Sequence, residues 1–298
     1  MIFPVPERKL TRRQFSNQHK NWVKAIKVKF LYYFTYCLLV FTVDPKIAFS
    51  ESQHDVLLAG FDVPRIGRQK QSTSKQTIDT LTNHVGIEFI LVPAGEFLMG
   101  SIDGDVDEQP IHRQRIDQPF YISKFEITQQ QWKKVMGTEP WNGRNPKAIG
   151  DNFPAIFVSW VDAQRFISRL NTLEECSCYS LPNEIHWEYA ARAGTSARYS
   201  FGNNKSRLGE YAWYAKNSMD EQHAQPVGRK KSNPWGLYDM EGNVWEWIKD
   251  SYSEDIGPRI RGGSWASPAS SLRPANRSAA QRDRRASHIG FRIYRAQQ

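Results

Sequence analysis

Nine of the chain's ten tryptophans lie between Trp132 and Trp265. Each aromatic side chain has a large apolar surface, and a soluble chain covers so many of them only by packing them into a core. The chain has 298 residues, of which 40% are hydrophobic, and this is enough for a sizeable core. We therefore expect one aromatic-rich folded domain, and the composition excludes a disordered or low-complexity chain.

The net charge of +9 is concentrated at the N-terminus. Residues 1–50 contain nine Lys and Arg and two acids, so they contribute +7 and leave only +2 for the rest of the chain. Proteins that bind nucleic acids carry a clustered basic face on the folded domain, which this distribution does not favour. We predict no nucleic-acid partner.

Residues 1–50 also have the parts of an export signal. A basic segment precedes the uncharged apolar run of residues 30–43, and Ala48 and Ser50 place small side chains at the −3 and −1 positions before Glu51. The run is shorter than the roughly 20 residues of a membrane-spanning helix. We predict a signal peptide and a periplasmic or secreted protein. The alternative is an uncleaved N-terminal segment that anchors the protein in the inner membrane. We expect contact with a membrane only through such a segment.

The segments that precede the domain differ from it in composition. Arg12 and Arg13 lie in a context similar to a twin-arginine motif, so both the general secretory route and the twin-arginine route stay open. Residues 51–84 are polar and have no apolar period, which indicates a linker. We assign residues 85–298 to the folded domain.

Helix-start signals delimit three helices. Thr128, Ser159 and Asn183 are suitable N-caps for helices over residues 129–136, 161–170 and 184–193. Two strands are expected before them, over residues 86–92 and 96–100. The residues after Gly194 are rich in Gly and Trp and lack a long helical period. We predict an α+β fold with about three helices, short strands and long ordered loops.

Two acids and a glycine form a candidate calcium loop. Asp239, Gly242, Val244 and Glu246 are spaced so that a tight turn at Gly242 can direct two carboxylates and two main-chain carbonyls toward one centre. Calcium prefers several oxygen ligands of these two kinds. We therefore list these four residues as candidate metal ligands.

The chain resembles the formylglycine-generating enzyme, or sulfatase-modifying factor, family through a series of motifs that occur in the family's order. The motifs are residues 92–97, 126–128, 158–163, 181–184, 187–192, 236–247, 261–265 and 290–292. The resemblance covers about residues 86–296. It implies a compact mixed domain related to the C-type-lectin architecture, and a structural calcium bound by Asp239, Gly242, Val244 and Glu246.

The resemblance also implies a chemistry that this chain cannot carry out in the family's way. Catalytic members hold Cu(I) with two C-terminal cysteine thiolates, which are soft ligands suited to that ion. This chain has no cysteine after Cys178, and Ser267 and Leu272 stand at the two positions. Related iron enzymes have a His-rich motif, whereas none of the seven histidines here are four residues apart. The sequence supports neither copper nor iron.

Cys176 and Cys178 are the cysteines that would stay in the exported chain. They lie in a loop between two expected helices, and the sequence leaves their state open: reduced, joined to each other, or joined to another chain. Copper binding by this pair is less favoured than these states.

Two functions therefore stay open. The first is an exported enzyme that modifies a peptidic substrate without copper, with Trp245, Ser264, Ser267, Asn276 and Arg277 lining the pocket because they match the family's active-site face. The second is a calcium-stabilised, non-catalytic module that binds or assembles a peptide or protein partner. Whether the protein is an enzyme is left open by the sequence.

Overall fold

The computed structural model describes residues 79–297, apart from residues 145, 219, 254 and 255. The signal segment predicted for residues 1–50, and most of the predicted linker 51–84, lie outside the described residues. Strand β1 (Thr80–Thr82) pairs with β2 (Glu88–Val92), so one short strand precedes residue 85. No helix in the described part of the chain is both long enough and apolar enough to cross a membrane.

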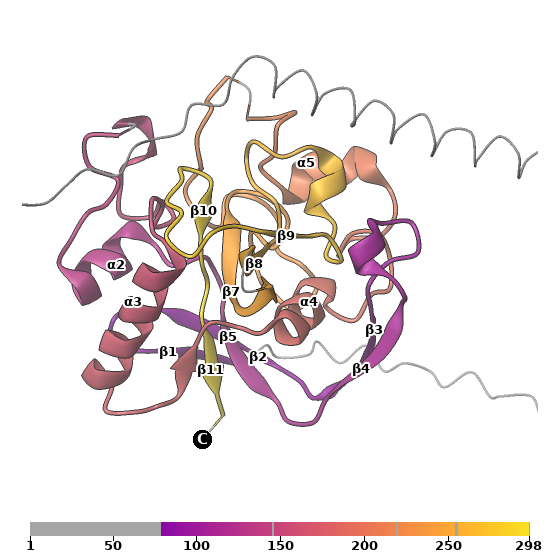
Figure 1. Cartoon of the computed structure of the whole chain (residues 1–298), viewed down its shortest axis with the longest axis horizontal. Helices are drawn as coiled ribbons and strands as arrows, with labels where there is room; N and C mark the ends of the chain where they lie inside the picture. The colour runs from indigo at the N-terminus through magenta and orange to yellow at the C-terminus, as the bar shows by residue number, and fades with distance from the viewer. Residues whose placement is uncertain (1–78, 145, 219, 254–255, 298) are drawn as a thin grey trace, which may run out of the picture. The chain divides into compact units, whose positions relative to one another are not determined.

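The strands of the described residues form three small sheets (Figure 1). The largest has the order β1-β2-β5-β11-β6, with β5 at Phe120–Ser123, β6 at Tyr179–Ser180 and β11 at Tyr294–Ala296. The second has the order β10-β7-β8-β9, with β7 at Trp245–Ser253, β8 at Gly257–Arg261, β9 at Arg277–Ala279 and β10 at Ile289–Gly290. The third pairs β3 (Gly95–Met99) with β4 (His112–Ile116). Because β11 pairs antiparallel with both β5 and β6, the C-terminal strand lies inside the first sheet, between these two strands.

The three predicted helices are present, and this confirms the α+β class. They are α2 (Gln129–Met136), α3 (Trp160–Leu173) and α4 (Glu184–Arg192), and a short α5 (Leu208–Tyr211) follows. Single 3-10 turns occur at Val106–Glu108, Pro146–Ala148, Lys205–Arg207 and Ala269–Leu272. The Thr128 and Ser159 side chains each complete a capping box, and Asn183 accepts a hydrogen bond from the His186 N–H group at 2.7 Å. The local start signals therefore place all three helices within a residue of their predicted starts.

Tryptophan and phenylalanine fill the main core between α2, α3 and the C-terminal segment. The rings of Trp132 and Phe166 stack with their centroids 5.6 Å apart, and Phe291 packs edge-on against both. None of these three side chains is more than 1% exposed. The aromatic-rich core expected from the composition therefore lies where α2 and α3 pack against the C-terminal segment around Phe291.

Buried ion pairs hold the long loops that connect the short strands in place. Arg273 forms two hydrogen bonds with Glu108, at 2.6 and 2.7 Å, and so ties the β3–β4 connection to a segment 165 residues away. Arg261 is fully buried, pairs with Glu188 and donates to the carbonyls of residues 274, 275 and 276. Arg273 also donates to the Ser270 carbonyl at 2.9 Å. The two arginines thus satisfy main-chain carbonyls of a loop, which a buried loop requires.

The Glu108–Arg273 pair gives a pH-dependent prediction. Burial alone would raise the pKa of Glu108, but the hydrogen bonds and charge of Arg273 outweigh it and hold the pKa below its usual value. This pair therefore stabilises the fold above the unfolded-state pKa and loses its effect as the pH falls through the folded-state pKa. We expect Arg273→Met to lower the free energy of unfolding by about 3 kcal/mol at pH 7, and by clearly less at pH 3, as measured by urea denaturation.

Arg113→Met is the matched control. Arg113 pairs with Glu96 at 2.8 Å, but its side chain is 74% exposed, so water already screens the pair. This variant should unfold like the wild type at both pH values. Equal losses for the two variants, or a loss for Arg273→Met that does not shrink in acid, would show that the buried pair does not hold this loop.

Candidate functional site

The predicted calcium loop is a tight turn that leads into β7. Asp239 and Asn243 adopt left-handed backbone angles, with φ of 56° and 61°. Gly242 has a φ of 104°, and a Cβ atom at this position would collide with the carbonyl oxygen of Trp213. Only glycine fits there, because it lacks the Cβ atom and tolerates positive φ. The sequence therefore places Gly242 where the backbone requires it.

Glu246 lies at the start of β7 and is fully buried. Its Oε2 atom accepts hydrogen bonds from Arg292 Nε at 2.7 Å and Trp187 Nε1 at 2.6 Å, and its Oε1 atom accepts from Arg292 Nη2 at 2.7 Å. Arg292 also donates to the carbonyls of Ser123 and Tyr238. Glu246 is therefore held in a bidentate ion pair, and each oxygen keeps limited capacity for a further partner.

Glu126 is a third buried carboxylate beside the same loop. Its side chain accepts hydrogen bonds from Asn243 Nδ2 at 2.8 Å and from the Val244 N–H group at 3.1 Å. Burial raises the pKa of Glu126 well above its usual value, and the negative charges of Asp239 and Glu246 act in the same direction. The three carboxylates thus form one electrostatic cluster with Arg292.

Asp239 is only partly satisfied. Its Oδ2 atom accepts a hydrogen bond from the Gly228 N–H group at 2.7 Å, whereas its buried Oδ1 atom has no hydrogen-bond partner among the described residues. Burial raises the pKa of Asp239 to about 6, against the opposing effects of the Gly228 N–H group and Arg292. A buried carboxylate oxygen without a partner is costly, so this atom is suited to an additional ligand.

The charges around the loop bear on the predicted calcium ion. When ionised, Glu126, Asp239 and Glu246 carry three negative charges, and the positive charges of Arg292 and Lys230 act on Asp239 in the opposite sense. A calcium ion would balance the surplus and would use the free Oδ1 atom of Asp239. Within the described residues, no three His, Cys, Asp or Glu side chains converge as a metal site. The predicted set has only two carboxylates and takes its other oxygens from the main chain, so calcium stays a prediction.

The positions that correspond to the family's copper thiolates are structural in this chain. The Oγ atoms of Ser264 and Ser267 lie 3.0 Å apart, and Ser267 Oγ also accepts a hydrogen bond from the Ser264 N–H group at 3.0 Å. Leu272 is fully buried in an apolar cluster with Tyr199 and Leu208. A closed serine pair and a core leucine cannot bind Cu(I), which needs soft ligands.

A small hollow lies next to this serine pair. It has a volume of about 160 Å³ and is lined by Ala215, Ser218, Gln222, Trp265 and Ala266. The Ala215 N–H group donates to the Ser267 carbonyl at 3.0 Å, which joins the wall of the hollow to the serine pair. The Ser218 hydroxyl is buried and has no hydrogen-bond partner among the described residues. Trp265 is half-buried, so its ring forms part of the molecular surface.

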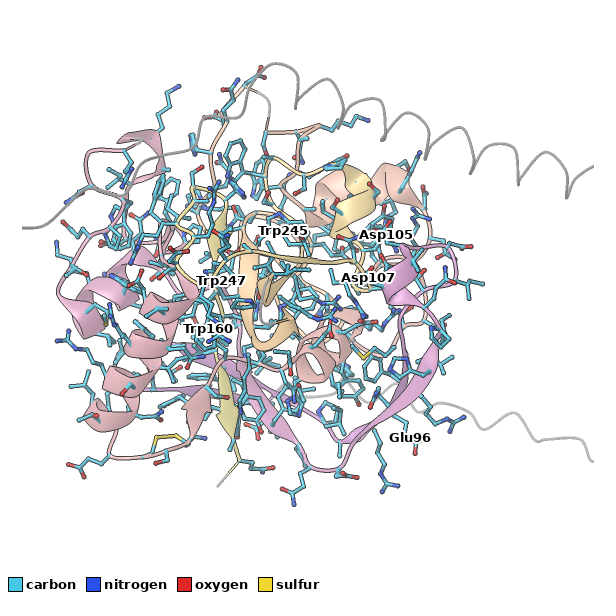
Figure 2. All side chains as sticks on the ribbon, in the orientation of Figure 1. Glu96, Asp105, Asp107, Trp160, Trp245 and Trp247 are labelled. Atoms are coloured by element: carbon cyan, nitrogen blue, oxygen red, sulfur yellow. A yellow bond between two sulfur atoms is a disulfide. The ribbon has the colours of Figure 1, made fainter. Side chains whose placement is uncertain are left out.

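The five predicted substrate-binding residues differ in their hydrogen-bond partners. Ser264 and Ser267 lie beside the hollow, and Trp245 is half-buried and packs against the main core. In contrast, Asn276 donates to Asp105 and Glu108, and Arg277 donates to the Asp107 carbonyl at 2.7 Å. Figure 2 shows Trp245 near the middle of the view, away from Asp105 and Asp107 at the right. Both residues thus contact the β3–β4 connection, and Arg277 also pairs with Glu184 on α4 at 3.2 Å.

Several residues that shape the site were not among the predicted site residues. Glu126 and Arg292 occur within the motifs that carry the resemblance, but nothing in their local sequence shows that they are buried together. Glu241 is 2% exposed, and burial raises its pKa to about 8 even though the Ser200 N–H group donates to it. A sequence shows the charge of such residues, whereas their burial depends on segments far away in the chain.

Comparison with known proteins finds several relatives of this chain. The chain is 30% identical over 203 residues to the chaperone protein LppX of Paenibacillus barcinonensis, an alignment that covers 50% of this chain and 70% of that protein. It is 26% identical over 283 residues to the formylglycine-generating enzyme of Mus musculus, with 69% and 74% covered. It is 28% identical over 232 residues to the serine/threonine-protein kinase pkn1 of Chlamydia pneumoniae, where it spans only 35% of the kinase.

The fold comparison points in the same direction. The structure of PvdO from Pseudomonas aeruginosa superposes with a TM-score of 0.64 at 26% identity, covering 74% of this chain and 98% of that one. The profile of the sulfatase-modifying factor enzyme 1-like domain matches residues 74–297. The match spans the described domain, so this chain belongs to the sulfatase-modifying factor family.

Proposed function

We propose that this protein is a calcium-stabilised, non-catalytic module that binds a peptide segment of a partner protein. The observation that carries the proposal is the state of the two former thiolate positions, a closed serine pair at Ser267 and a core leucine at Leu272. With these side chains the family's copper chemistry has no ligands, while the surface next to them keeps a hollow. Without copper chemistry, we infer that this surface functions by binding a ligand in the hollow.

The size and lining of the hollow suit one side chain of a peptide. Whole small-molecule ligands occupy pockets of roughly 300–1,000 Å³, and this hollow has about 160 Å³. Trp265 offers an aromatic wall, and aromatic residues are frequent energetic centres of protein interfaces. The unpartnered hydroxyl of Ser218 offers a hydrogen bond to the incoming group.

A relative supports a polypeptide as the ligand. LppX, which is named a chaperone protein, aligns over 70% of its length with this chain. A chaperone acts on other polypeptides, and a comparable ligand class fits the hollow described here. Export of the chain, as its N-terminal segment predicts, would place this binding outside the cytoplasm.

In the proposed module, calcium stiffens the loop beneath the binding surface. Asp239 and Glu246 would hold the ion with their carboxylates, and Gly242 and Val244 with their carbonyls. The ion would supply charge neutralisation for the buried acids. The Trp265 N–H group donates to the Asn243 carbonyl at 2.8 Å, so the loop and the hollow are directly connected.

We expect chelation to lower the melting temperature of the wild type, and calcium to restore it. Asp239→Asn should abolish this response because it removes the charge of one ligand, while the side-chain oxygen that accepts from the Gly228 N–H group is kept. Differential scanning calorimetry with and without chelator measures the effect. A wild type that melts at the same temperature in both conditions would contradict calcium binding.

Glu246→Gln is less informative, because it also breaks the ion pair with Arg292 and destabilises the fold for that reason. Asp151→Asn provides a matched control. Asp151 is exposed and lies near α2, outside the loop, so this variant should keep the full response to chelator.

We expect Trp265→Ala to weaken binding to peptides about tenfold, because the ring forms a wall of the hollow. Ser218→Ala should weaken binding without lowering the melting temperature, since the hydroxyl has no partner to lose. The probe is an array of unbiased synthetic peptides, followed by fluorescence anisotropy on those that bind. Leu173→Ala, an exposed change on α3, is the control.

The same peptides distinguish the module from an enzyme. Bound peptides incubated with the protein, oxygen and either iron or copper should keep their mass. A mass change that depends on the wild-type protein would contradict the proposal and favour modification of a peptidic substrate. Equal binding by the wild type, Trp265→Ala and Leu173→Ala would show that the hollow is not the binding site.

A further inference from the structure

A second feature lies away from the hollow, in the loop between α3 and β6. Cys176 and Cys178 form a disulfide across a single residue, with their Cα atoms 5.4 Å apart. Of the three states that the sequence left open, the structure has the two cysteines joined to each other. Cys176 is half-buried and Ser177 is exposed, whereas Cys178 is 7% exposed.

The disulfide contributes little to holding the fold. The stabilisation that a disulfide gives through loop entropy grows with the length of the loop, and this loop is among the shortest a disulfide can close. The Asn171 side chain already fixes the same loop, because its amide donates to the Tyr179 carbonyl and accepts from the Tyr179 N–H group, both at 3.0 Å. The Cys176 N–H group also donates to the Asn171 carbonyl at 3.0 Å. The loop conformation is therefore secured without the S–S bond.

The disulfide also borders open space. An open concavity of about 820 Å³ is lined by Cys176 and Ser177 together with polar side chains of α3, among them Gln164, Ser168 and Thr172. Glu175 and Lys249 line it as well and provide charges of both signs. A polar concavity of this size accepts a segment of polypeptide, and its polar walls can satisfy the segment's backbone groups.

We propose that the Cys176–Cys178 pair is a redox-active disulfide that exchanges with a dithiol on a partner polypeptide seated in this concavity. A thiolate of the partner attacks Cys176 Sγ, the more accessible sulfur, and forms a mixed disulfide. The Cys176–Cys178 bond breaks, and Cys178 leaves as a thiolate that takes up a proton. The second thiol of the partner then attacks the partner sulfur in the mixed disulfide and releases Cys176. Two electrons and two protons pass from the partner dithiol to the cysteine pair.

The loop is suited to this cycle in both directions. In the disulfide-bonded loop, the Cys178 N–H group lies 3.4 Å from Cys176 Sγ as a hydrogen-bond donor. After reduction Cys176 is the more accessible thiol, and the same donor is next to its sulfur. Such a donor stabilises a thiolate. Because Asn171 holds the loop in place, Cys178 stays next to Cys176 after reduction and can resolve a mixed disulfide. The cysteines thus differ in role: Cys176 exchanges and Cys178 resolves.

The test uses the full chain in a Cys37→Ser background, because Cys37 is the third cysteine and lies outside the described residues. The oxidised protein is mixed with a synthetic peptide that carries two cysteine thiols, quenched in acid at intervals, and analysed by mass spectrometry. We expect the peptide to be oxidised at least about tenfold faster than with the Cys176→Ser/Cys178→Ser variant, which has no disulfide to exchange, and the Cys176–Cys178 pair to be reduced at the same rate as the peptide is oxidised. Equal rates of peptide oxidation with the two proteins would overturn the proposal.

Single variants test the assigned roles. Reduced Cys178→Ser, mixed with the oxidised peptide, should accumulate a mixed disulfide through Cys176, and Cys176→Ser should accumulate much less because Cys178 is buried. The double variant should melt within about 5 °C of the wild type. A larger drop would identify the bridge as a structural staple and overturn the proposal, as would equal trapping by the two single variants.

Discussion

The bidentate ion pair between Glu246 and Arg292 is the interaction on which the rest of this structure depends. Arg292 lies in the last segment of the domain, yet its guanidinium reaches Glu246 on β7 and the carbonyls of Ser123 and Tyr238. It therefore joins the C-terminus, the end of β5, the acidic loop and β7 in one buried cluster. Breaking such a pair leaves an uncompensated charge in the core, so the arrangement specifies this packing strongly.

Buried arginine–glutamate pairs also occur where the strands are too short to provide hydrogen-bond partners for the main-chain carbonyls. Arg261 pairs with Glu188 and donates to three consecutive carbonyls, and Arg273 holds Glu108. Regular sheets would satisfy these carbonyls through ladders, but β6, β9 and β10 have only two or three residues each. Buried arginines therefore take the place of ladders, and long loops between residues 194 and 293 become rigid enough to present a surface. The acidic loop lacks such a balance, because Arg292 and Lys230 face three carboxylates.

Features encoded locally could be predicted from the sequence. Thr128, Ser159 and Asn183 begin helices because the side chain of each accepts a hydrogen bond from the N–H group three residues later. The turn at Gly242 follows from the absence of a Cβ atom. Order and spacing of the motifs were enough to identify the family, and with it the α+β architecture.

Features that join distant segments could not be predicted in this way. Glu126 meets Asn243 across 117 residues, and no local pattern shows that such an acid is buried. Asn276 and Arg277 were predicted to line the substrate pocket by their position in a motif, and this stays a prediction. No local pattern shows that Asn276 donates to Asp105, or that Arg277 donates to the Asp107 carbonyl. The spacing of Cys176 and Cys178 likewise left their pairing open. The loop that brings them together is held by hydrogen bonds of the Asn171 side chain with Tyr179, which the spacing does not show.

The central physical claim is that the surplus negative charge at the acidic loop is neutralised by a calcium ion. Terbium luminescence measures this most directly, because terbium takes oxygen-rich calcium sites and is excited by nearby indoles, here Trp187, Trp245 and Trp247 around Glu246. The account predicts saturable luminescence at one terbium per chain, displaced by calcium at far lower concentration than by magnesium. Absence of sensitised luminescence, or emission that calcium does not displace, would contradict it.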